Sequence, residues 1–239
     1  MQTNYTRPKN LLSKGTSNTK TAKNSLKTYI LYLAPYNQNS KGINICPKAS
    51  KGCAAACLFT AGRGRFDNVK NARINRTEYF LADKERFCLQ LAGELIKINK
   101  AAIKKGELVA IRLNGTSDLD FIYLLQKYAQ LDPFSLKNLV YYDYTKILGK
   151  VKKYKDQPRY VLTFSRAEDN HSEAIEALEL GANVSAVFNG DLPFNYWGAP
   201  VVDGDKSDIV MLYNRGAVLG LKAKGQAKKD TSGFVINTN

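Results

Sequence analysis

The sequence is poor in histidine and in long apolar runs, and each shortage excludes a class of protein. One histidine among 239 residues excludes the paired cysteines and histidines of a zinc finger, and no Walker-type phosphate loop is present. No window reaches the ~18–20 consecutive apolar residues of a membrane-spanning helix. The N-terminus also lacks the apolar segment of a signal peptide. These absences predict a cytoplasmic protein.

Positive charge is the main excess in the composition. Lys and Arg total 36 against 21 Asp and Glu, so the formal net charge is +15. An excess of this size favours a polyanionic partner such as nucleic acid or a nucleotide. The hydrophobic content of 44% is ordinary for a globular core, and the length suits one large domain. We therefore expect a single basic domain that binds a polyanion.

Residues 1–27 differ in composition from the rest of the chain. They are rich in Lys, Asn, Ser and Thr, and they offer only Leu11, Leu12 and Leu26 for burial. This composition predicts a flexible basic arm, followed by one folded domain over residues 28–239. Two interpretations of the arm stay open: it embraces a phosphate backbone, or it is a solvated tail.

From Thr28 onward, short apolar runs alternate with helical stretches, which predicts an α/β fold with a parallel sheet. A complete or partial (β/α) barrel and an open doubly wound sheet both fit this alternation, and we favour the barrel. The expected strands are Thr28–Ala34, Leu108–Leu113, Asn138–Tyr142, Tyr160–Phe164, Val184–Phe188, Ala199–Val202, Ile209–Leu212 and Ala217–Leu221. The expected helices are Asp83–Lys105, Leu119–Leu131 and Ser172–Leu180.

A small polar cluster follows five of the expected strands. In (β/α) barrels the segments after the strands meet at one face and build the active site. The same residue types also form turns and helix N-caps, which is the alternative explanation. The clusters are Asn114–Asp118, Asp143–Thr145, Ser165–Arg166, Asn189–Asp191 and Asp203–Asp205. The candidate catalytic groups, for handling substrate or protons, are Asp118, Asp143, Asp203 and Asp205.

Three of the four cysteines, Cys46, Cys53 and Cys57, lie within twelve positions of one another. Disulfides are disfavoured in a reducing cytosol, so this spacing indicates a metal or iron–sulfur site. If the alanine-rich stretch between Cys53 and Cys57 is helical, both thiolates lie on one face. Three thiolates suit an iron–sulfur cluster with one iron open to a ligand, whereas structural zinc usually takes four protein ligands.

Two other interpretations of the cysteine loop stay open. The three cysteines can pack as small hydrophobic side chains without any ligand. Alternatively they bind zinc, with Cys88 or His171 as the fourth ligand. Cys88 falls beside Phe87 and Leu89 in an expected helix, which is typical of a core position. His171 lies at an expected helix start, where it is a surface side chain or a catalytic base.

Two segments rich in glycine and basic residues are candidates for phosphate or nucleic-acid contact. Glycine exposes backbone amides, and lysine supplies a flexible point charge; ordinary solvated surface charge is the alternative. The candidate residues are Arg63 and Arg65 in AGRGRF, and Lys222, Lys224, Lys228 and Lys229 in GLKAKGQAKKD. Tyr141, Tyr142 and Tyr144 follow one another closely at a strand end, where they stack on a base or belong to the core.

Three parts of the sequence together resemble a known family. They are LAPYNQNSKGINICPKASKGCAAACLFTAGRG, VAIRLNGTSDLDF and GLKAKGQAKKDTSGFV, with Val69, Ala72-Arg73 and Arg76-Thr77 between the first two. This pattern resembles the phage-associated gene product 88 family over roughly residues 30–236, most specifically in the cysteine loop and in RLNGTSD. The resemblance implies a phage or mobile-element protein and no established activity.

The layout also resembles that of radical S-adenosylmethionine enzymes, which place a cysteine loop after the first strand of a barrel-like fold. This resemblance implies a [4Fe–4S] cluster on Cys46, Cys53 and Cys57. Their gaps of six and three residues exceed the three and two of those enzymes; a longer loop closes at little entropic cost. By position, the residues implied for S-adenosylmethionine are Asn114, Gly115, Thr116, Ser117, Ser165 and Arg166.

The leading prediction from these patterns is an iron–sulfur, radical S-adenosylmethionine-like enzyme that acts on a nucleotide or nucleic acid. Its cofactor would perform the chemistry and the protein would orient the substrate. The competing prediction is a non-enzymatic nucleic-acid-binding protein whose cysteine loop is a structural zinc or iron–sulfur site.

Overall fold

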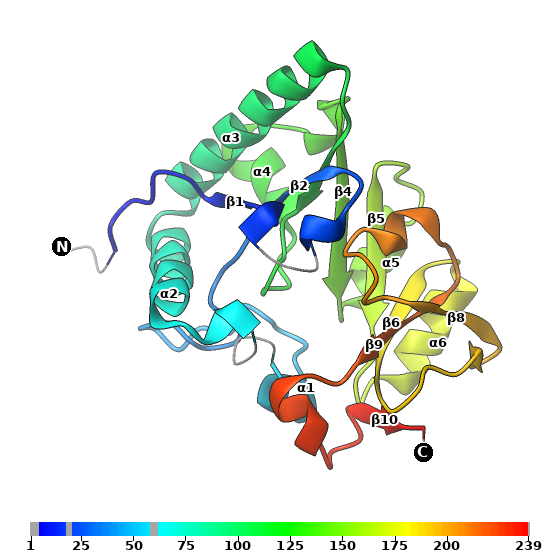
Figure 1. Cartoon of the computed structure of the whole chain (residues 1–239). Helices are drawn as coiled ribbons and strands as arrows, with labels where there is room; N and C mark the ends of the chain where they lie inside the picture. The colour runs from blue at the N-terminus through cyan, green and yellow to red at the C-terminus, as the bar shows by residue number, and fades with distance from the viewer. Residues whose placement is uncertain (1–4, 18–20, 58–61, 239) are drawn as a thin grey trace.

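A computed structural model describes residues 5–17, 21–57 and 62–238 (Figure 1). Within these residues the strands form one ten-stranded sheet in the order β1-β2-β3-β4-β5-β6-β9-β8-β7, with β10 beside β6. The run from β2 to β8 is parallel, while β1 and β7 pair antiparallel with their neighbours. The α/β class and the parallel sheet are therefore confirmed. The strands are β1 Leu12–Lys14, β2 Lys27–Leu31, β3 Val109–Arg112, β4 Leu139–Thr145, β5 Tyr160–Ser165, β6 Asn183–Asn189, β7 Asn195–Tyr196, β8 Ala199–Asp203, β9 Val218–Lys222 and β10 Val235–Asn237.

The sheet is open in the part of the chain that the structure describes. Strand β1 lies at one end and the β7–β8 hairpin at the other, and the strand order does not close on itself. A closed barrel is thus not the arrangement seen here. Antiparallel pairing at both ends distinguishes this sheet from the uniformly parallel ring of a (β/α) barrel.

Six α-helices occur in the described ranges, and none combines the length and apolar character needed to cross a membrane. The three expected helices are confirmed, and each of their ends lies within two residues of the predicted position. Helices α2 and α5 were not expected. Helix α2 is polar along most of its length; it buries Arg73 near its middle and Thr77, Glu78, Tyr79 and Phe80 near its end. The helices are α1 Lys51–Ala55, α2 Asp67–Ala82, α3 Lys84–Lys105, α4 Phe121–Ala129, α5 Leu148–Tyr154 and α6 His171–Glu179.

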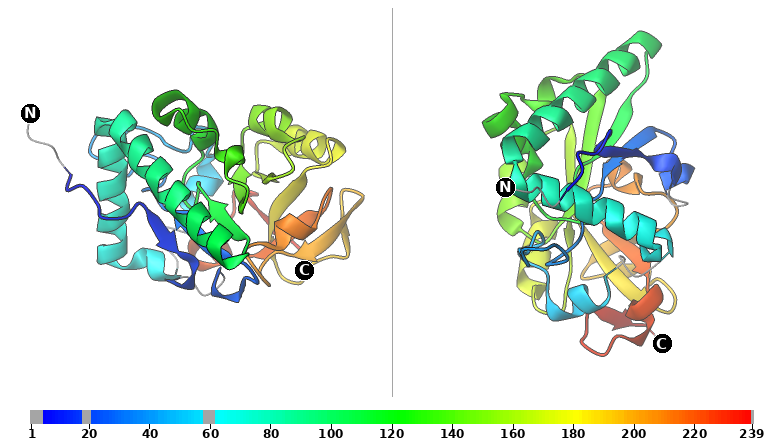
Figure 2. Two further views of the ribbon diagram at one scale, coloured as in Figure 1. Left: turned by 90° about the horizontal axis from the view of Figure 1, so that it is seen from above. Right: turned by 90° about the vertical axis from the view of Figure 1, so that its left-hand side faces the viewer.

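The main core lies between one face of the sheet and helices α3 to α6 (Figure 2). Helix α3 contributes Phe87, Leu91 and Leu95, which recur at the three-to-four-residue spacing of an amphipathic helix. Its N-cap Asp83 accepts a hydrogen bond from the Arg86 amide, and it ends at a left-handed glycine. The helices therefore cover this face of the sheet in the manner usual for parallel strands.

The opposite face of the sheet is covered by residues 207–213 rather than by a helix layer. Ile209 and Met211 pack on Tyr142 and Leu219, and Asp208 forms an ion pair of 3.2 Å with Arg112 of β3. The prediction of a strand over Ile209–Leu212 was wrong, because this segment is a short 3-10 helix, Val210–Tyr213. Its apolar side chains pack on the face of the sheet, so the segment is apolar although it is not a strand of the sheet.

The N-terminal strap, residues 5–11, differs from the flexible arm expected over residues 1–27. Tyr5 stacks on Tyr79 with ring centroids 4.9 Å apart, and Leu11 is fully buried. The Glu94 carboxylate accepts hydrogen bonds from the amides of Leu11 and Leu12 at 2.7 and 2.9 Å. A few apolar side chains and one carboxylate therefore fix a segment whose composition alone suggested disorder.

Candidate functional site

Helix α1, which carries Cys53, lies beyond the carboxyl ends of the parallel strands, in the lower part of Figure 1 near β10. Ser50 caps the helix by accepting a hydrogen bond from the Cys53 amide, and its hydroxyl donates to Glu168 at 2.8 Å. The Gly52 amide donates to the same carboxylate at 2.7 Å. A side chain at Gly52 would meet Phe234, with its Cβ only 2.8 Å from that residue's Cβ. Glycine here allows the C-terminal segment to pack directly on the cysteine helix.

The Glu168 carboxylate that anchors α1 is itself stabilised as an anion. Burial alone would raise its pKa, but hydrogen bonds from its own amide, the Gly52 amide and the Ser50 hydroxyl lower the pKa below its usual range. The nearby Lys146 ammonium acts in the same direction. A charged Glu168 therefore fixes the position of Cys53.

Cys46 lies in the loop between β2 and α1 and contacts two backbone groups. Its Sγ accepts a hydrogen bond from the Tyr36 amide at 3.4 Å and lies 3.7 Å from the carbonyl oxygen of Thr116. Tyr36 has φ 53°, a left-handed conformation that is uncommon for a residue with a side chain. Backbone strain of this kind is found where surrounding contacts hold the chain, often at functional sites.

Cys46 lies within electrostatic range of the other two loop cysteines. Burial raises the pKa of Cys46 to about 12; the Tyr36 amide opposes this rise, and the nearby Cys57, Asp118 and Cys53 add to it. The side chains of all three cysteines are partly buried. The sequence patterns placed them in one loop, and the structure brings their thiols within electrostatic range of one another.

Two cations lie next to these thiols. Lys146, the first residue after β4, is only 7% exposed, and its Nζ donates to the Ser165 hydroxyl at 2.9 Å. Burial raises the pKa of Cys53, and the Lys146 ammonium opposes that rise by its charge and a hydrogen bond. The Arg73 guanidinium, from α2, lies 4.9 Å from the Tyr32 ring centroid; burial lowers its pKa, and Tyr32 and Cys57 oppose the change. Lys146 and Arg73 therefore offset part of the negative charge that Asp118 and Glu168 place near the cysteines.

Asp118, the first-choice catalytic carboxylate, connects the loops of this site. It is 8% exposed and accepts hydrogen bonds from the Thr145 hydroxyl and the Lys146 amide, both at 2.8 Å. Its ion pair with Lys150 measures 2.9 Å, and its amide donates to the carbonyl of Ile45, next to Cys46. Its oxygens are thus occupied by protein groups, which gives it a positioning role.

Asp143 and Asn114 form a second buried pair. Asp143 is fully buried and accepts hydrogen bonds from the Asn114 amide at 2.7 Å and from the Tyr160 hydroxyl at 3.1 Å. Burial raises the pKa of Asp143 to about 6. The Asn114 side chain also bonds Ser117 and Leu119, so it organises the RLNGTSD turn. The hydroxyl of Thr116, in the same turn, donates a hydrogen bond to the Leu33 carbonyl.

The remaining predicted cofactor residues line the same edge of the sheet. Gly115 packs under the Tyr32 ring, where a Cβ would lie 2.6 Å from a ring carbon. Ser165 contacts Lys146, and Arg166 donates to the carbonyls of Gly233 and Phe234 at 2.7 and 2.8 Å. Arg166 therefore ties the C-terminal segment to the end of β5.

The residues predicted for catalysis and phosphate contact after β8 and β9 are separate and more exposed. Asp205 accepts from the Lys222 amide and pairs with Lys224 at 2.8 Å, and Asp203 accepts from the Asp205 amide. Lys228 and Lys229 are exposed in a 3-10 helix whose Ala227 packs near Ala56. Arg65 is exposed, 5.7 Å from the Phe66 ring, and the side chain of Arg63 lies outside the described residues.

The other candidates have structural surroundings. Cys88 is fully buried in the main core, where burial raises its pKa to about 11. His171 packs edge-on against Trp197 at 4.5 Å. Tyr141 and Tyr142 are fully buried, and Tyr144 lies under Arg112 at 4.9 Å. These contacts favour the core interpretation of the tyrosines and of Cys88.

The cysteine side chains are the type of ligand that an iron–sulfur cluster takes. Within the described ranges no three His, Cys, Asp or Glu side chains surround one point as ligands of a single ion. Sulfurs around one zinc ion lie about 2.3 Å from it. An iron–sulfur cluster, which distributes its thiolates over different irons, accepts sulfurs that lie further apart.

The fold and this cysteine-bearing edge define an α/β protein whose candidate site follows the carboxyl ends of parallel strands. The family model described as Gene product 88 matches residues 10–238. The chain therefore belongs to the gene product 88 family. Comparison with curated proteins and with solved structures gives no match.

Three groups in the site were not indicated by sequence patterns. Lys146 directly follows β4 and Glu168 lies three residues after β5, so the rule that singled out Asn114 and Asp118 applies to them as well. Arg73 comes from α2, a helix without apolar periodicity, and only its place in the family resemblance connected it with the cysteine loop.

Proposed function

We propose that Cys46, Cys53 and Cys57 bind an iron–sulfur cluster in an enzyme of phage or mobile-element origin. The proposed substrate is a nucleotide or nucleic acid, and the proposed small ligand of the open iron is S-adenosylmethionine. The observation that carries the proposal is the position of the cysteine loop at the carboxyl ends of the parallel strands, with Lys146 hydrogen-bonded to Cys53 and Arg73 within electrostatic range of Cys57.

The protein groups around the thiols suit a thiolate-ligated cluster. The Tyr36 amide donates to Cys46 Sγ, and hydrogen bonds to sulfur are one means by which proteins set the potential of such clusters. Lys146 and Arg73 offset the negative charge of the thiolates. When bound, the cluster would supply one-electron reduction, and the chain would orient the substrate and exclude water.

Several predicted residues take positioning roles in this proposal. Asp118 fixes Lys146 and the loop that carries Cys46, while Asp143 and Asn114 hold the RLNGTSD turn. Ser165 positions the Lys146 ammonium. None of these groups needs to contact the substrate in order to affect the reaction.

Anaerobic reconstitution with iron and sulfide tests this function. We expect a brown protein with a broad absorbance at about 400 nm and stoichiometric iron and sulfide. We also expect that, after reduction, it cleaves S-adenosylmethionine. A reconstituted protein that stays colourless would contradict the cluster, and a coloured one that leaves S-adenosylmethionine intact would contradict the ligand.

A second function follows from the basic segment next to α1. Lys228 and Lys229 are exposed on the short helix whose Ala227 packs near Ala56, so they flank the cysteine helix. We therefore keep as the alternative a non-enzymatic nucleic-acid-binding protein with a structural zinc or iron–sulfur site. Colourless protein that holds stoichiometric zinc and binds nucleic acid would favour it.

A further inference from the structure

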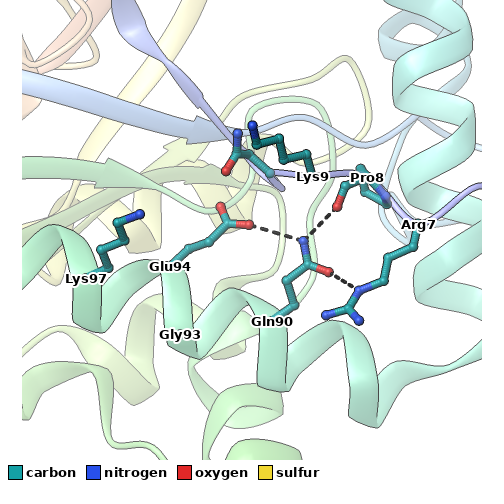
Figure 3. A pocket seen from close by; sticks show the side chains of 8 residues that line it. Arg7, Pro8, Lys9, Gln90, Gly93, Glu94 and Lys97 are labelled. Carbon is teal, nitrogen blue, oxygen red and sulfur yellow. Dashed lines mark hydrogen bonds between the residues drawn. The ribbon is translucent and has the colours of Figure 1, made fainter.

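A groove of about 450 Å³ lies between the N-terminal strap and helix α3, away from the cysteines (Figure 3). Its walls are the strap, through Arg7 and Lys9, and the outer face of α3, through Gln90, Glu94 and Lys97. The groove opens to solvent, and the three basic side chains are exposed. The composition of residues 1–27 allowed phosphate contact by the arm, but no motif in the sequence pointed to α3.

The groove is held in shape by side-chain hydrogen bonds. Gln90 accepts from Arg7 Nε at 3.0 Å and donates to the carbonyl of Pro8 at 2.9 Å. Glu94 accepts from the amides of Leu11 and Leu12 at 2.7 and 2.9 Å, and Figure 3 shows its side chain between Lys97 and the strap. The one carboxylate of the groove is thus occupied by backbone amides, and the surface is left with net positive charge.

The positive charge continues along α3. Lys97, Lys100 and Lys104 are exposed and lie three and four residues apart, so they share one face of the helix. At 1.5 Å per residue they cover roughly 10 Å of helix axis. A row of flexible cations without an aromatic side chain beside it suits a repeating phosphate backbone rather than a single small anion.

Gly93 lies in the floor of the groove, at the middle of a 22-residue helix. Glycine at such a position costs roughly 0.5–1 kcal/mol relative to alanine. A Cβ built at Gly93 would have no atom within 4 Å, so packing inside the protein does not require glycine there. The glycine is explained if another molecule approaches the helix closely here, because a side chain at this position would stand in its way.

We propose that the groove between the strap and α3 binds the phosphate backbone of nucleic acid without reading its sequence. Arg7, Lys9 and Lys97 contact phosphates, Lys100 and Lys104 extend the track, and Gly93 leaves room for the strand. The proposal does not depend on what the cysteines bind, and it places the polyanion expected from the net charge of +15 on a defined surface.

Fluorescence anisotropy with labelled duplex and single-stranded DNA of roughly 20 nucleotides tests the groove, because backbone binding weakens linearly in log affinity with log salt. We expect Arg7→Glu and Lys97→Glu each to weaken binding about fivefold or more and to reduce the salt slope by about 1. Lys155→Glu is the charge-matched control, because Lys155 is exposed directly after α5 and does not line the groove. It is expected to change affinity less than twofold.

Gly93 provides a variant that separates binding from folding. Gly93→Leu is expected to raise the thermal midpoint, since leucine favours helix and the space is open, and to weaken DNA binding about fivefold. Equal affinity of Lys97→Glu and the unmodified protein would overturn the proposal. So would salt-independent binding, or binding to phosphatidylserine vesicles but not to DNA.

Discussion

The polar segments after β3 and β4 look like those after β6 and β8 in the sequence, yet the two sets have different surroundings. Asp118, which follows β3, and Asp143, which lies within β4, are buried and hydrogen-bonded to groups from other segments. At the end of β8, Asp203 and Asp205 are partly exposed. Asp203 accepts a hydrogen bond from the Asp205 amide, and Asp205 accepts one from Lys224. Asp191, after β6, is exposed.

This difference divides the sheet edge into a half with buried polar groups and a half with exposed turns. Strands β2 to β5 bring together loops from distant parts of the chain, and their buried polar groups must satisfy one another. The β8 and β9 turns satisfy their own backbone and face water, as ordinary turns do. The predictions below ask whether the energetic cost of substitution follows the same division.

The largest effect is expected for Asp118→Asn, because this change leaves the buried Lys150 ammonium without its anion. Removal of one partner from a buried ion pair costs about 3–5 kcal/mol. Urea unfolding measures the loss in the free energy of unfolding. The Asp118→Asn, Lys150→Met double variant should recover part of this loss, since no buried charge then remains unpaired. A loss in the free energy of unfolding under about 1 kcal/mol for Asp118→Asn alone would contradict the burial argument.

Asp143 should make stability depend on pH. Burial raises its folded-state pKa to about 6, above the ~3.9 of an unfolded aspartate. The folded state therefore holds this proton more tightly, and the resulting stability is complete below about pH 4 and lost as the pH rises through about 6. The difference corresponds to roughly 3 kcal/mol by pH 7.

Comparison with Asp143→Asn isolates this titration. The amide does not titrate, so the variant should lack this part of the loss between about pH 4 and pH 7. Urea unfolding of both proteins across that range gives the difference directly. Parallel stability curves for the two proteins would show that Asp143 titrates alike in the folded and unfolded chain.

Gly115→Ala is expected to cost about 1–3 kcal/mol through overpacking. Its Cβ would lie 2.6 Å from the Tyr32 ring, beside the cysteine site. Gly149→Ala is the matched control, because Gly149 lies in helix α5 with no atom within 4 Å of a Cβ. Alanine there should stabilise the protein by up to about 1 kcal/mol, and thermal unfolding of both variants measures the contrast.

The smallest effect is expected at the exposed end of the sheet. Asp205→Asn removes the pairing with Lys224, whose side chain is half exposed, and pairs of this kind contribute about 1 kcal/mol or less. The free energy of unfolding should therefore stay within about 1 kcal/mol of the unmodified protein. A loss as large as that of Asp118→Asn would remove the distinction between the two regions.

Much of the fold could be predicted from periodicity, and its exceptions have physical causes. Apolar spacing identified α3, and continuous apolar runs identified most parallel strands. The same rule failed at Ile209–Leu212, because an apolar run that covers a sheet face has the composition of a strand within it. Helix α2 escaped notice because its polar sequence takes its stability from a few contacts, such as the stacking of Tyr5 on Tyr79.

The site could be predicted in position but not in the roles of its residues. Spacing was enough to group Cys46, Cys53 and Cys57, since neighbours in a loop stay close in space. Whether Asp118 faces substrate or protein depends on Thr145 and Lys150, some thirty residues away, and sequence distance hides such contacts.

The central claim is that the three loop thiols act together and Cys88 does not. Its most direct test is the iron content of Cys46→Ser, Cys53→Ser and Cys57→Ser after anaerobic reconstitution, with Cys88→Ser as the control. Each loop variant should lose most of its bound iron and its absorbance at about 400 nm, while Cys88→Ser keeps both. Full iron in any loop variant, or its loss only with Cys88→Ser, would contradict the claim.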